Sequence, residues 1–512
     1  MKISTKTLTF SLVIMTSLCL SGCGQNSRAA SNQSDTVSMN NTENNTAVVE
    51  MQQFKDIKAK ADKGDIEAQC LLASCYNSGL HGCVIDKTKA QELFQKVAKH
   101  ANESLAAVQH SKGVCFKNGY GVTKDVAEAA KWYRKAADQG YAPAQNSLGV
   151  CYRNGEGVPQ DDQKMLEWYR KAADQGFAIA QSNIGGLHAN GRVVEQSDEK
   201  AVEWRRKAAD QGYANARYYL AGNYKEGRGV PQNIAEAVKW YRLATEQGHA
   251  AAQFELSSYC FYKKDYPEAV KWLRLAAEQG YAPAQYLLGV FHIEGEVVNQ
   301  SYSEAAKWLL KAAEQGHVYA QHNLGIYYSV TSVPRDHKEA MKWFRKAAEQ
   351  EHAMAQYNLG CYYYEDEVVK RDLKEAVDWF RKAAEQGFAG AQYNLGYCYE
   401  NGEGVKKDLN EAVKWYLKAA EQGHEDALYA VKDLVASNRR SPSSSVSGAS
   451  ISRWDDWIKN LGSYEDRMKK QEEFWKREQE REDRYQREQY EDRRREEQRQ
   501  REYEQAQPKW YE

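Results

Sequence analysis

The sequence predicts an all-α fold: an αα-hairpin repeat solenoid, wound as a right-handed superhelix, with a charged C-terminal tail that is helical or disordered. A tryptophan-centred phrase such as Lys131–Gly140 (KWYRKAADQG) returns at steps of 36, 36, 36, 32, 36, 35, 36 and 36 residues. A fixed period in this range is typical of stacked copies of one supersecondary unit. Each copy also holds two apolar stripes at helical spacing, separated by glycines. The recurring tryptophans are Trp132, Trp168, Trp204, Trp240, Trp272, Trp308, Trp343, Trp379 and Trp415.

The first helix of a unit is illustrated by the repeat that spans Tyr141–Gly176. Pro143 suits the first helical turn, where its missing N–H costs nothing. Ala144, Leu148 and Tyr152 recur every four residues and form one apolar face. The repeat therefore predicts a helix that buries this face.

The second helix of the same unit follows a short polar loop. Asn154–Gly155 ends the first helix, because glycine adopts the left-handed conformation of a C-cap without strain. Asp161 is a suitable N-cap for the second helix, and Gly176 is expected to cap its end. Ala172–Ala173 is small where two helices should come close, and Trp168 should fill the gap between one hairpin and the next.

These residues carry a family resemblance. Gly396–Val405 (GYCYENGEGV), followed by Ala412–Ala420 (AVKWYLKAA), is similar to the Sel-1-like repeat (SLR), a relative of the tetratricopeptide repeat. The resemblance covers roughly residues 64–436. It implies an αα superhelix that acts as a scaffold or adaptor for other proteins, but it does not identify the partner.

The N-terminus, residues 1–22, is predicted to be a secretory signal, with an apolar run from Leu8 to Leu20 behind two lysines. The run ends Leu20-Ser21-Gly22-Cys23, which resembles a bacterial lipoprotein box. The resemblance implies a diacylglyceryl thioether on Cys23, cleavage before it and acylation of the new amino terminus. The alternative is an ordinary signal peptide that contains a cysteine.

The remaining domain boundaries follow from composition. Residues 23–50 are rich in Asn, Ser and Thr and read as a disordered tether. Residues 51–436 form the solenoid, with about ten units and a capping helix. A Ser-rich linker spans 437–463 and the charged tail spans 464–512. Because 13 Lys/Arg balance 15 Asp/Glu between residues 464 and 504, and the whole chain has net charge −1, we expect no nucleic-acid partner.

Three units depart from the pattern. The first carries Leu93-Phe94 where later units carry Trp-Tyr, as expected of a terminal, capping unit. The sixth lacks the Gly-x-Gly loop and runs straight through Tyr262–Pro267. The eighth has Ser329–Pro334 in place of the glycines. We expect either of the last two sites to change the superhelical pitch.

The sequence contains few motifs that indicate catalysis or metal binding. Ser197–Lys200 fits S-x-x-K, which matters because cysteine-rich relatives are linked to β-lactam binding, but Ser197 falls at an N-cap position and no S-D-N or K-T-G element accompanies it. Histidines recur where other units carry Tyr or Phe, which favours packing over metal ligation. We therefore predict no enzyme, catalytic residue, cofactor or metal. These histidines are His249, His317, His352 and His424.

The cysteines are expected to serve mainly as small core residues, because several share one repeat position. Cys70, Cys75 and Cys83 cluster within one unit, and in an exported protein a single disulfide there remains open.

The predicted function is a non-enzymatic, lipid-anchored scaffold of the bacterial cell envelope that binds a protein or peptide partner. In a Gram-negative host, Gly24 after Cys23 favours the outer membrane, facing the periplasm. The alternative is an envelope hydrolase or β-lactam-binding protein.

The partner is predicted to bind the concave groove of the later units, residues 213–423. By analogy with tetratricopeptide repeats, the first helix of each unit lines that groove, and its inward positions become aromatic along the chain. Aromatic side chains dominate binding hot spots. The alternative is that these rings only pack between adjacent first helices. The candidates are Tyr218, Phe254, Phe261, Tyr286, His322, Tyr357, Tyr364, Tyr393 and Tyr397.

Overall fold

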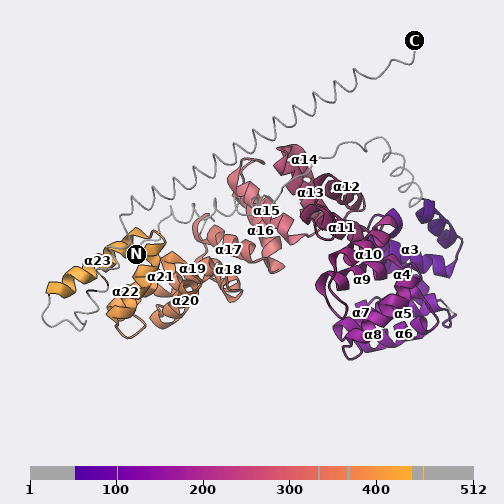
Figure 1. The fold of residues 1–512 in the computed structure, drawn as a ribbon, viewed down its shortest axis with the longest axis horizontal. Coiled ribbons are helices and arrows are strands. Elements are labelled where there is room, and N and C mark those ends of the chain that lie inside the picture. The colour runs from indigo at the N-terminus through magenta and orange to yellow at the C-terminus, as the bar shows by residue number, and fades with distance from the viewer. Residues whose placement is uncertain are drawn as a thin grey trace, which may run out of the picture. The chain divides into compact units, whose positions relative to one another are not determined.

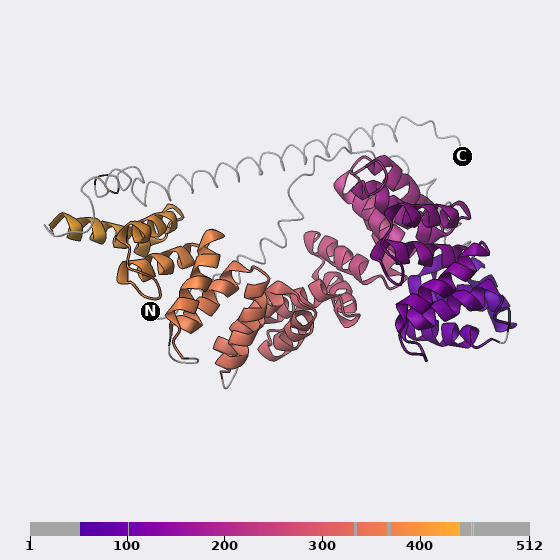
Figure 2. The same cartoon turned by 90° about the horizontal axis from the view of Figure 1, so that it is seen from below.

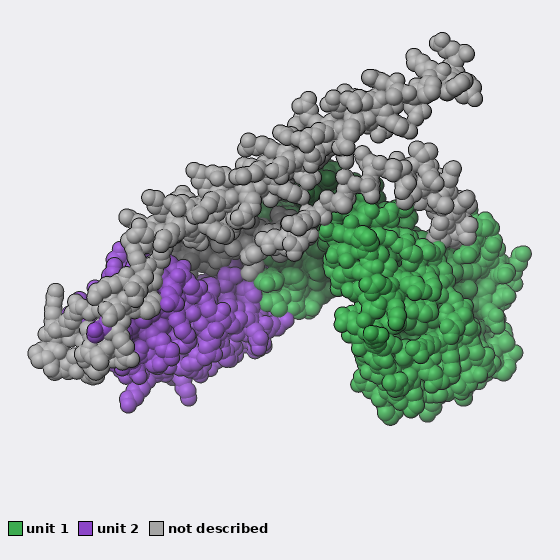
Figure 3. All heavy atoms as spheres, viewed as in Figure 1, with its two compact units in different colours: residues 1–320 green, residues 321–512 purple. Residues whose placement is uncertain are grey.

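The computed structural model describes residues 52–100, 102–331, 335–365 and 370–440, together with Ser452 and Trp454. Every regular element among these residues is a helix, which confirms the all-α class. The chain divides into two compact units, residues 1–320 and 321–512 (Figure 3). The expected signal peptide, Cys23, the tether and the charged tail lie outside the described residues.

The helices form successive pairs, and within residues 66–314 and 337–440 each helix packs against the next one in the chain (Figure 1; Figure 2 shows the same helices from below). Residues 52–62 are helical and precede the first pair. The first helices of the pairs are α3 (Ile66–Ser78), α5 (Ala106–Asn118), α7 (Ala142–Asn154), α9 (Ala178–Asn190), α11 (Ala214–Glu226), α13 (Ala250–Tyr262), α15 (Ala282–Glu294), α17 (Val318–Ile326), α19 (Ala353–Tyr364) and α21 (Ala389–Asn401). The second helices are α4 (Lys87–Ala98), α6 (Val126–Asp138), α8 (Asp162–Asp174), α10 (Asp198–Asp210), α12 (Ile234–Thr245), α14 (Tyr266–Glu278), α16 (Tyr302–Glu314), α18 (His337–Glu349), α20 (Leu373–Glu385) and α22 (Leu409–Glu421). The predicted αα-hairpin solenoid is thus confirmed.

The expected caps define the helix ends. Asp161 accepts a hydrogen bond from the backbone N–H of Lys164 at 2.9 Å and starts α8. Gly155 ends α7 with φ +71°, in the left-handed region that glycine adopts without strain. The second helix ends slightly earlier than expected: Gln175 is the C-cap of α8, and Gly176 follows at φ +83°.

The two irregular units use other turns. In the sixth, Lys264 at φ +62° takes the place of glycine, and only three residues separate α13 from α14. In the eighth, α17 continues as one π-helical turn, η2 (Tyr327–Thr331). A π-helical turn accommodates extra residues without breaking the helix.

The two helices of a pair approach closely because a glycine faces an aromatic ring. A Cβ built on Gly149 of α7 would lie 2.6 Å from Cδ1 of Tyr169 on α8. The same collision would occur between Gly360 and Phe380, at 2.6 Å, and between Gly396 and Tyr416, at 2.7 Å. Since such contacts are too short for any real Cβ, the glycine after the recurrent leucine is a packing requirement.

The recurrent tryptophans lie between hairpins, as expected, and a lysine ammonium lies over the ring of most of them. Trp168 is 7% exposed and belongs to a core cluster that includes residues of its own and the neighbouring pairs. The ammonium of Lys171 lies 4.1 Å from its ring centroid, and that of Lys382 lies 3.8 Å from Trp379. These cation–π contacts cover the outer face of the ring.

The C-terminal end of the repeats differs from the expectation of a lone capping helix. The last first-type helix, α23 (Glu425–Arg440), extends into the segment predicted as linker. Trp454, also inside that segment, is 8% exposed and packs in one cluster with Val413, Val431 and Leu434. The far end of the core is therefore covered by a tryptophan from beyond residue 440.

Truncation of an interhairpin tryptophan should loosen the solenoid locally. Trp379 is 7% exposed, so Trp379→Ala is expected to cost about 3–5 kcal/mol. Because solenoid contacts are mostly between neighbours, amide exchange should rise more in residues 353–424 than in residues 52–180. The matched control Lys382→Ala removes only the cation–π contact with Trp379 and should cost about 0.5–1 kcal/mol. Equal loosening throughout the described chain would contradict this expectation.

Candidate functional site

The predicted partner-binding rings lie on the first helices, where most of them meet a ring from the start of the next unit. That second ring is the N-cap residue of the following first helix. These candidate rings thus join neighbouring hairpins, as the packing alternative expected. The pairs, by centroid distance, are Tyr218–His249 at 4.9 Å, Phe254–Tyr281 at 5.6 Å, Tyr286–His317 at 4.7 Å, His322–His352 at 4.7 Å, Tyr357–Phe388 at 5.0 Å and Tyr393–His424 at 4.7 Å.

Exposure divides the candidates into two groups. Phe261, Tyr286 and His322 are buried, at 9%, 7% and 4% exposed, so they offer a partner almost no surface. The others keep an accessible edge beside their packed face. The half-buried group comprises Tyr218, Phe254, Tyr357, Tyr364, Tyr393 and Tyr397.

Carboxylates surround the tyrosines of the last two pairs. The hydroxyl of Tyr364 donates to Glu403 at 2.5 Å, and that of Tyr416 donates to Glu400 at 2.7 Å. Burial raises the pKa of Tyr364, and its bond to Glu403 adds to the shift. Tyr416 is 1% exposed, so of these two bonds only that between Tyr364 and Glu403 lies at an accessible edge.

A polar ladder accompanies the rings, and the sequence reasoning missed it. Asn183 donates to Asn146 of the preceding first helix at 2.9 Å. His322 and Asn358 make the corresponding contact at 3.3 Å. The recurrence of Asn or Ser directly before the core leucine was the available signal. These bonds fix how one first helix lies on the next.

The recurrent histidines act as helix caps. Nδ1 of His249 accepts from the backbone N–H of Ala252 at 3.1 Å, and Nδ1 of His352 accepts from that of Ala355 at 3.2 Å. A side-chain acceptor at this position satisfies one of the orphan N–H groups of the first turn. Histidine therefore combines capping with stacking, which explains its recurrence where other units carry Tyr or Phe.

One cysteine–histidine pair has the composition of a catalytic dyad but not its environment. Sγ of Cys70 lies 3.6 Å from Nδ1 of His110, and Nε2 of His110 lies 3.1 Å from the hydroxyl of Ser147. Cys70 is 0% and His110 3% exposed. Burial raises the pKa of Cys70 and lowers the pKa of His110 to about 4. At neutral pH the pair is un-ionised and out of reach of a substrate, so it is part of the core.

The serine motif likewise has a structural role. Oγ of Ser197 accepts from the backbone N–H of Lys200 at 3.2 Å and caps α10, as its position predicted. The same hydroxyl donates to Glu199 at 2.9 Å, on the exposed first turn of α10.

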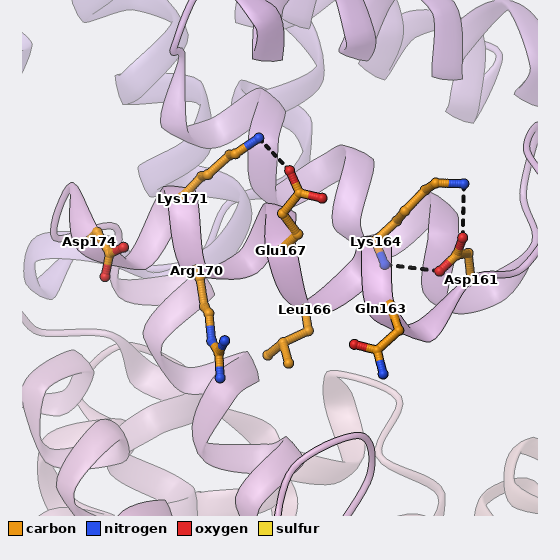
Figure 4. Close-up of a pocket in the computed structure, with 8 residues that line it drawn as sticks. All are labelled: Asp161, Gln163, Lys164, Leu166, Glu167, Arg170, Lys171 and Asp174. Carbon is orange, nitrogen blue, oxygen red and sulfur yellow. Dashed lines mark hydrogen bonds and ion pairs between the residues drawn. The ribbon is translucent and has the colours of Figure 1, made fainter.

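A surface hollow of about 510 Å³ runs along α8 (Figure 4). Its charged groups are engaged with each other: Lys171 with Glu167 at 2.6 Å and Lys164 with Asp161 at 2.9 Å. Side chains from a single helix do not converge on a ligand from several directions, so the hollow lacks the form of a binding pocket. The lining residues are Asp161, Gln163, Lys164, Leu166, Glu167, Arg170, Lys171 and Asp174.

The described part of the chain contains no cluster of three or more His, Cys, Asp or Glu side chains suited to a metal ion. Its eight cysteines, Cys70, Cys75 and Cys83 among them, are all unpaired in this structure. None of the helices described combines the length and apolarity that a membrane span requires.

The fold and these contacts define a class: an αα-hairpin repeat protein whose first helices carry rings and amides between units. The Sel1 repeat family matches nearly the whole described region, and the chain belongs to this family. The matched residues are 66–102, 105–141, 142–177, 178–213, 214–249, 250–281, 282–317, 318–352, 353–388 and 389–424. Proteins of this family are generally interaction scaffolds that bind protein partners.

The chain is similar to several proteins of solved structure. A protective antigen of uropathogenic Escherichia coli with an SLR fold is 31% identical, with a TM-score of 0.50, over 80% of this chain and 94% of that one. A Sel1 repeat protein from Oxalobacter formigenes is 32% identical, with a TM-score of 0.44, over 61% of this chain and 94% of that one. Cysteine-rich protein B of Helicobacter pylori is 27% identical, with a TM-score of 0.22, over 27% of this chain and 98% of that one.

The buried histidines predict that mild acid destabilises the fold. Burial lowers the pKa of His110, His249 and His352 to about 4 and that of His322 to about 3. Unfolded histidines titrate near pH 6.5. Below that pH the unfolded chain binds more protons, so stability is complete above pH 6.5 and is lost as pH falls toward 4.

The measurement is the urea midpoint between pH 7 and pH 5, where most carboxylates stay ionised. His322→Phe keeps a ring at this position, as Phe254 does in its own unit, but does not titrate. We expect it to flatten the pH dependence even if it lowers the midpoint at pH 7. A midpoint independent of pH in this window would rule out the explanation.

Proposed function

We propose that this protein is a non-enzymatic scaffold, lipid-anchored in a bacterial cell envelope, that holds a protein or peptide partner along the first helices of its later units. The observation that carries the proposal is the set of half-buried rings on the first helices: Tyr218 and Phe254 in residues 1–320, and Tyr357, Tyr364, Tyr393 and Tyr397 in residues 321–512. Tyr218 and Tyr393, for example, are each stacked on a neighbouring ring and keep an edge accessible. Rings immobilised in this way lose little entropy on binding, and so they suit a hot spot.

The surface chemistry favours a partner segment with basic side chains. In residues 321–512, Tyr364 is paired with Glu403, and Asp426 beside Tyr393 contributes to the raised pKa of that tyrosine, behind the larger effect of burial. Aromatic faces and carboxylates both attract Lys and Arg. An extended segment is the best fit, because Tyr357 and Tyr393 lie on successive first helices instead of lining one pocket.

The envelope setting rests on the sequence Leu20-Ser21-Gly22-Cys23 and the apolar run before it. A lipid anchor at Cys23 with several acyl chains would hold the protein at the membrane stably, whereas a single chain binds only marginally. In a Gram-negative host this proposal places the scaffold on the outer membrane, facing the periplasm.

The partner surface is tested by the double substitution Tyr357→Ala and Tyr393→Ala. A photo-crosslinking amino acid at position 397, one turn beyond Tyr393, reports capture in cells. A hot-spot ring contributes about 2 kcal/mol or more, which alone corresponds to ~30-fold. Because such contributions are not additive, we expect the loss of both rings to lower the adduct yield by at least this factor.

The control is Tyr262→Ala, which removes a tyrosine that is 78% exposed and lies outside this set of rings. Circular dichroism and the urea midpoint verify that the double variant is folded. Full adduct yield from a folded double variant, with loss on deletion of the charged tail, residues 464–512, instead, would place the partner elsewhere.

The anchor is tested by Cys23→Ala. We expect this variant to move from the membrane fraction to the soluble periplasmic or secreted fraction, because the acylated thiol is gone. Metabolic labelling with a palmitate analogue should mark the wild type and not the variant. An unlabelled wild type would refute the lipoprotein assignment and leave the partner surface untouched.

A further inference from the structure

The first helix pair contacts two pairs that are far from it in sequence. Cys75, Leu80 and Cys83 belong to the same core cluster as Ala208 and Tyr213, about 130 residues later. Within residues 1–320 (Figure 1), the end of α3 and the loop after it thus contact residues of α10 and α11. In a solenoid whose units touch only their neighbours, such a contact is not expected.

Two backbone hydrogen bonds join these segments. The N–H of Ala214, the first residue of α11, donates to the carbonyl of Gly79 at 3.4 Å. The N–H of Ile85 donates to the carbonyl of Gln247 at 3.3 Å. The loop between α3 and α4 is thus held at both ends, with the short 3₁₀ turn η1 (Leu80–Gly82) between the two bonds.

The approach is close enough to require small residues. A Cβ built on Gly79 would lie 3.2 Å from Cβ of Ala214 and 3.3 Å from Oε1 of Gln247. Gly79 also has φ +67°, so the position favours glycine on two grounds. Ala214 itself is 0% exposed.

Burial shows that this contact is specific to one pair of units. Tyr213 is 6% and Gln247 2% exposed. At the same repeat positions elsewhere, Tyr141 and Tyr281 are half-buried and Gln279 is exposed. The turns around residues 213 and 247 are therefore covered by the α3–α4 loop, which does not cover the corresponding turns at residues 141 and 281.

Both partners in the contact depart from the repeat pattern. The loop carries Leu80, 2% exposed, where the third unit carries Glu156. On the receiving side, the first-helix glutamine that elsewhere accepts from the turn glutamine, as Gln145 does from Gln175 at 2.7 Å, is replaced by Arg217. Arginine has no hydrogen-bond acceptor. Gln247 therefore cannot make the bond that Gln175 makes to Gln145, at the place where the loop packs.

We propose that this contact is a clasp: the α3–α4 loop fastens the first pair directly onto the fourth and fifth, so that residues 66–249 open as one cooperative block instead of pair by pair. The clasp links units that are not neighbours, and it buries the apolar loop. It stands independently of the proposed partner.

The first test acts on the receiving side. Ala214→Leu puts a larger side chain against Gly79, while the matched Ala282→Leu makes the same change at the first residue of α15, which is half-buried. Cys83 is 4% exposed and lies in the clasp, so its modification by a maleimide reports opening. We expect Ala214→Leu to raise the labelling rate of Cys83 more than 10-fold relative to Cys398, and Ala282→Leu to leave it unchanged. Equal rates in both variants would overturn the clasp.

The second test acts on the loop. Leu80→Asp should disrupt the contact, whereas Val84→Asp, at a residue 59% exposed on the same loop, should not. Amide exchange of residues 208–220 and 244–252 should rise in Leu80→Asp only. If Leu80→Asp unfolds the first pair and the rise is confined to its sequence neighbours, residues 106–138, then units are coupled only to neighbours and the clasp is wrong.

Discussion

The close approach of a side-chain-free Cα to an aromatic ring sets the spacing of several helix pairs, and much of the solenoid's packing follows from it. Gly149 accepts Tyr169, and Gly396 accepts Tyr416, at distances that any Cβ would make impossible. Once the pair is this tight, alanines suffice at the remaining contact positions: Ala172 and Ala173 are 0% and 3% exposed. The large tryptophans are then left to fill the space between pairs, which explains their strict period along the chain.

Much of this could be predicted from sequence because each feature is local. The period, the caps at Gly155 and Asp161, and the all-α class depend on residues within one unit and recur often enough to be unambiguous. Contacts between distant units have no such signal. Nothing local in Leu80 or Ala214 indicates that they meet, and Trp454 stands alone beyond a Ser-rich stretch although it packs in the last core cluster. Loops and termini were therefore the parts where the sequence was least informative.

The candidate surface shows the same division. Repeat register correctly placed the rings on the first helices, since register needs only the position of the core leucine. Register does not reveal what covers each ring. Tyr286 lies 4.7 Å from His317 and is 7% exposed, whereas Tyr393 lies at the same distance from His424 and remains half-buried. The difference arises from neighbours outside the stacked pair, and only the structure supplies them. Register did not reveal the capping role of the histidines either, because it does not show which backbone groups a side chain contacts.

Contacts between neighbouring pairs and the contact between the first and fifth pairs transmit the effect of a bound partner differently along the chain. Ring contacts such as Tyr357–Phe388 and bonds such as Asn358–His322 connect each pair to the next, so strain introduced at one unit passes to its neighbours and decays with distance. The contact of Gly79 with Ala214 bypasses three units within residues 66–249. Units joined in that way share their opening free energy, and they resist the small changes of curvature by which solenoids adapt to a ligand. Units linked only through their neighbours keep that freedom, which is a physical reason for an adaptable binding surface to lie in the later repeats.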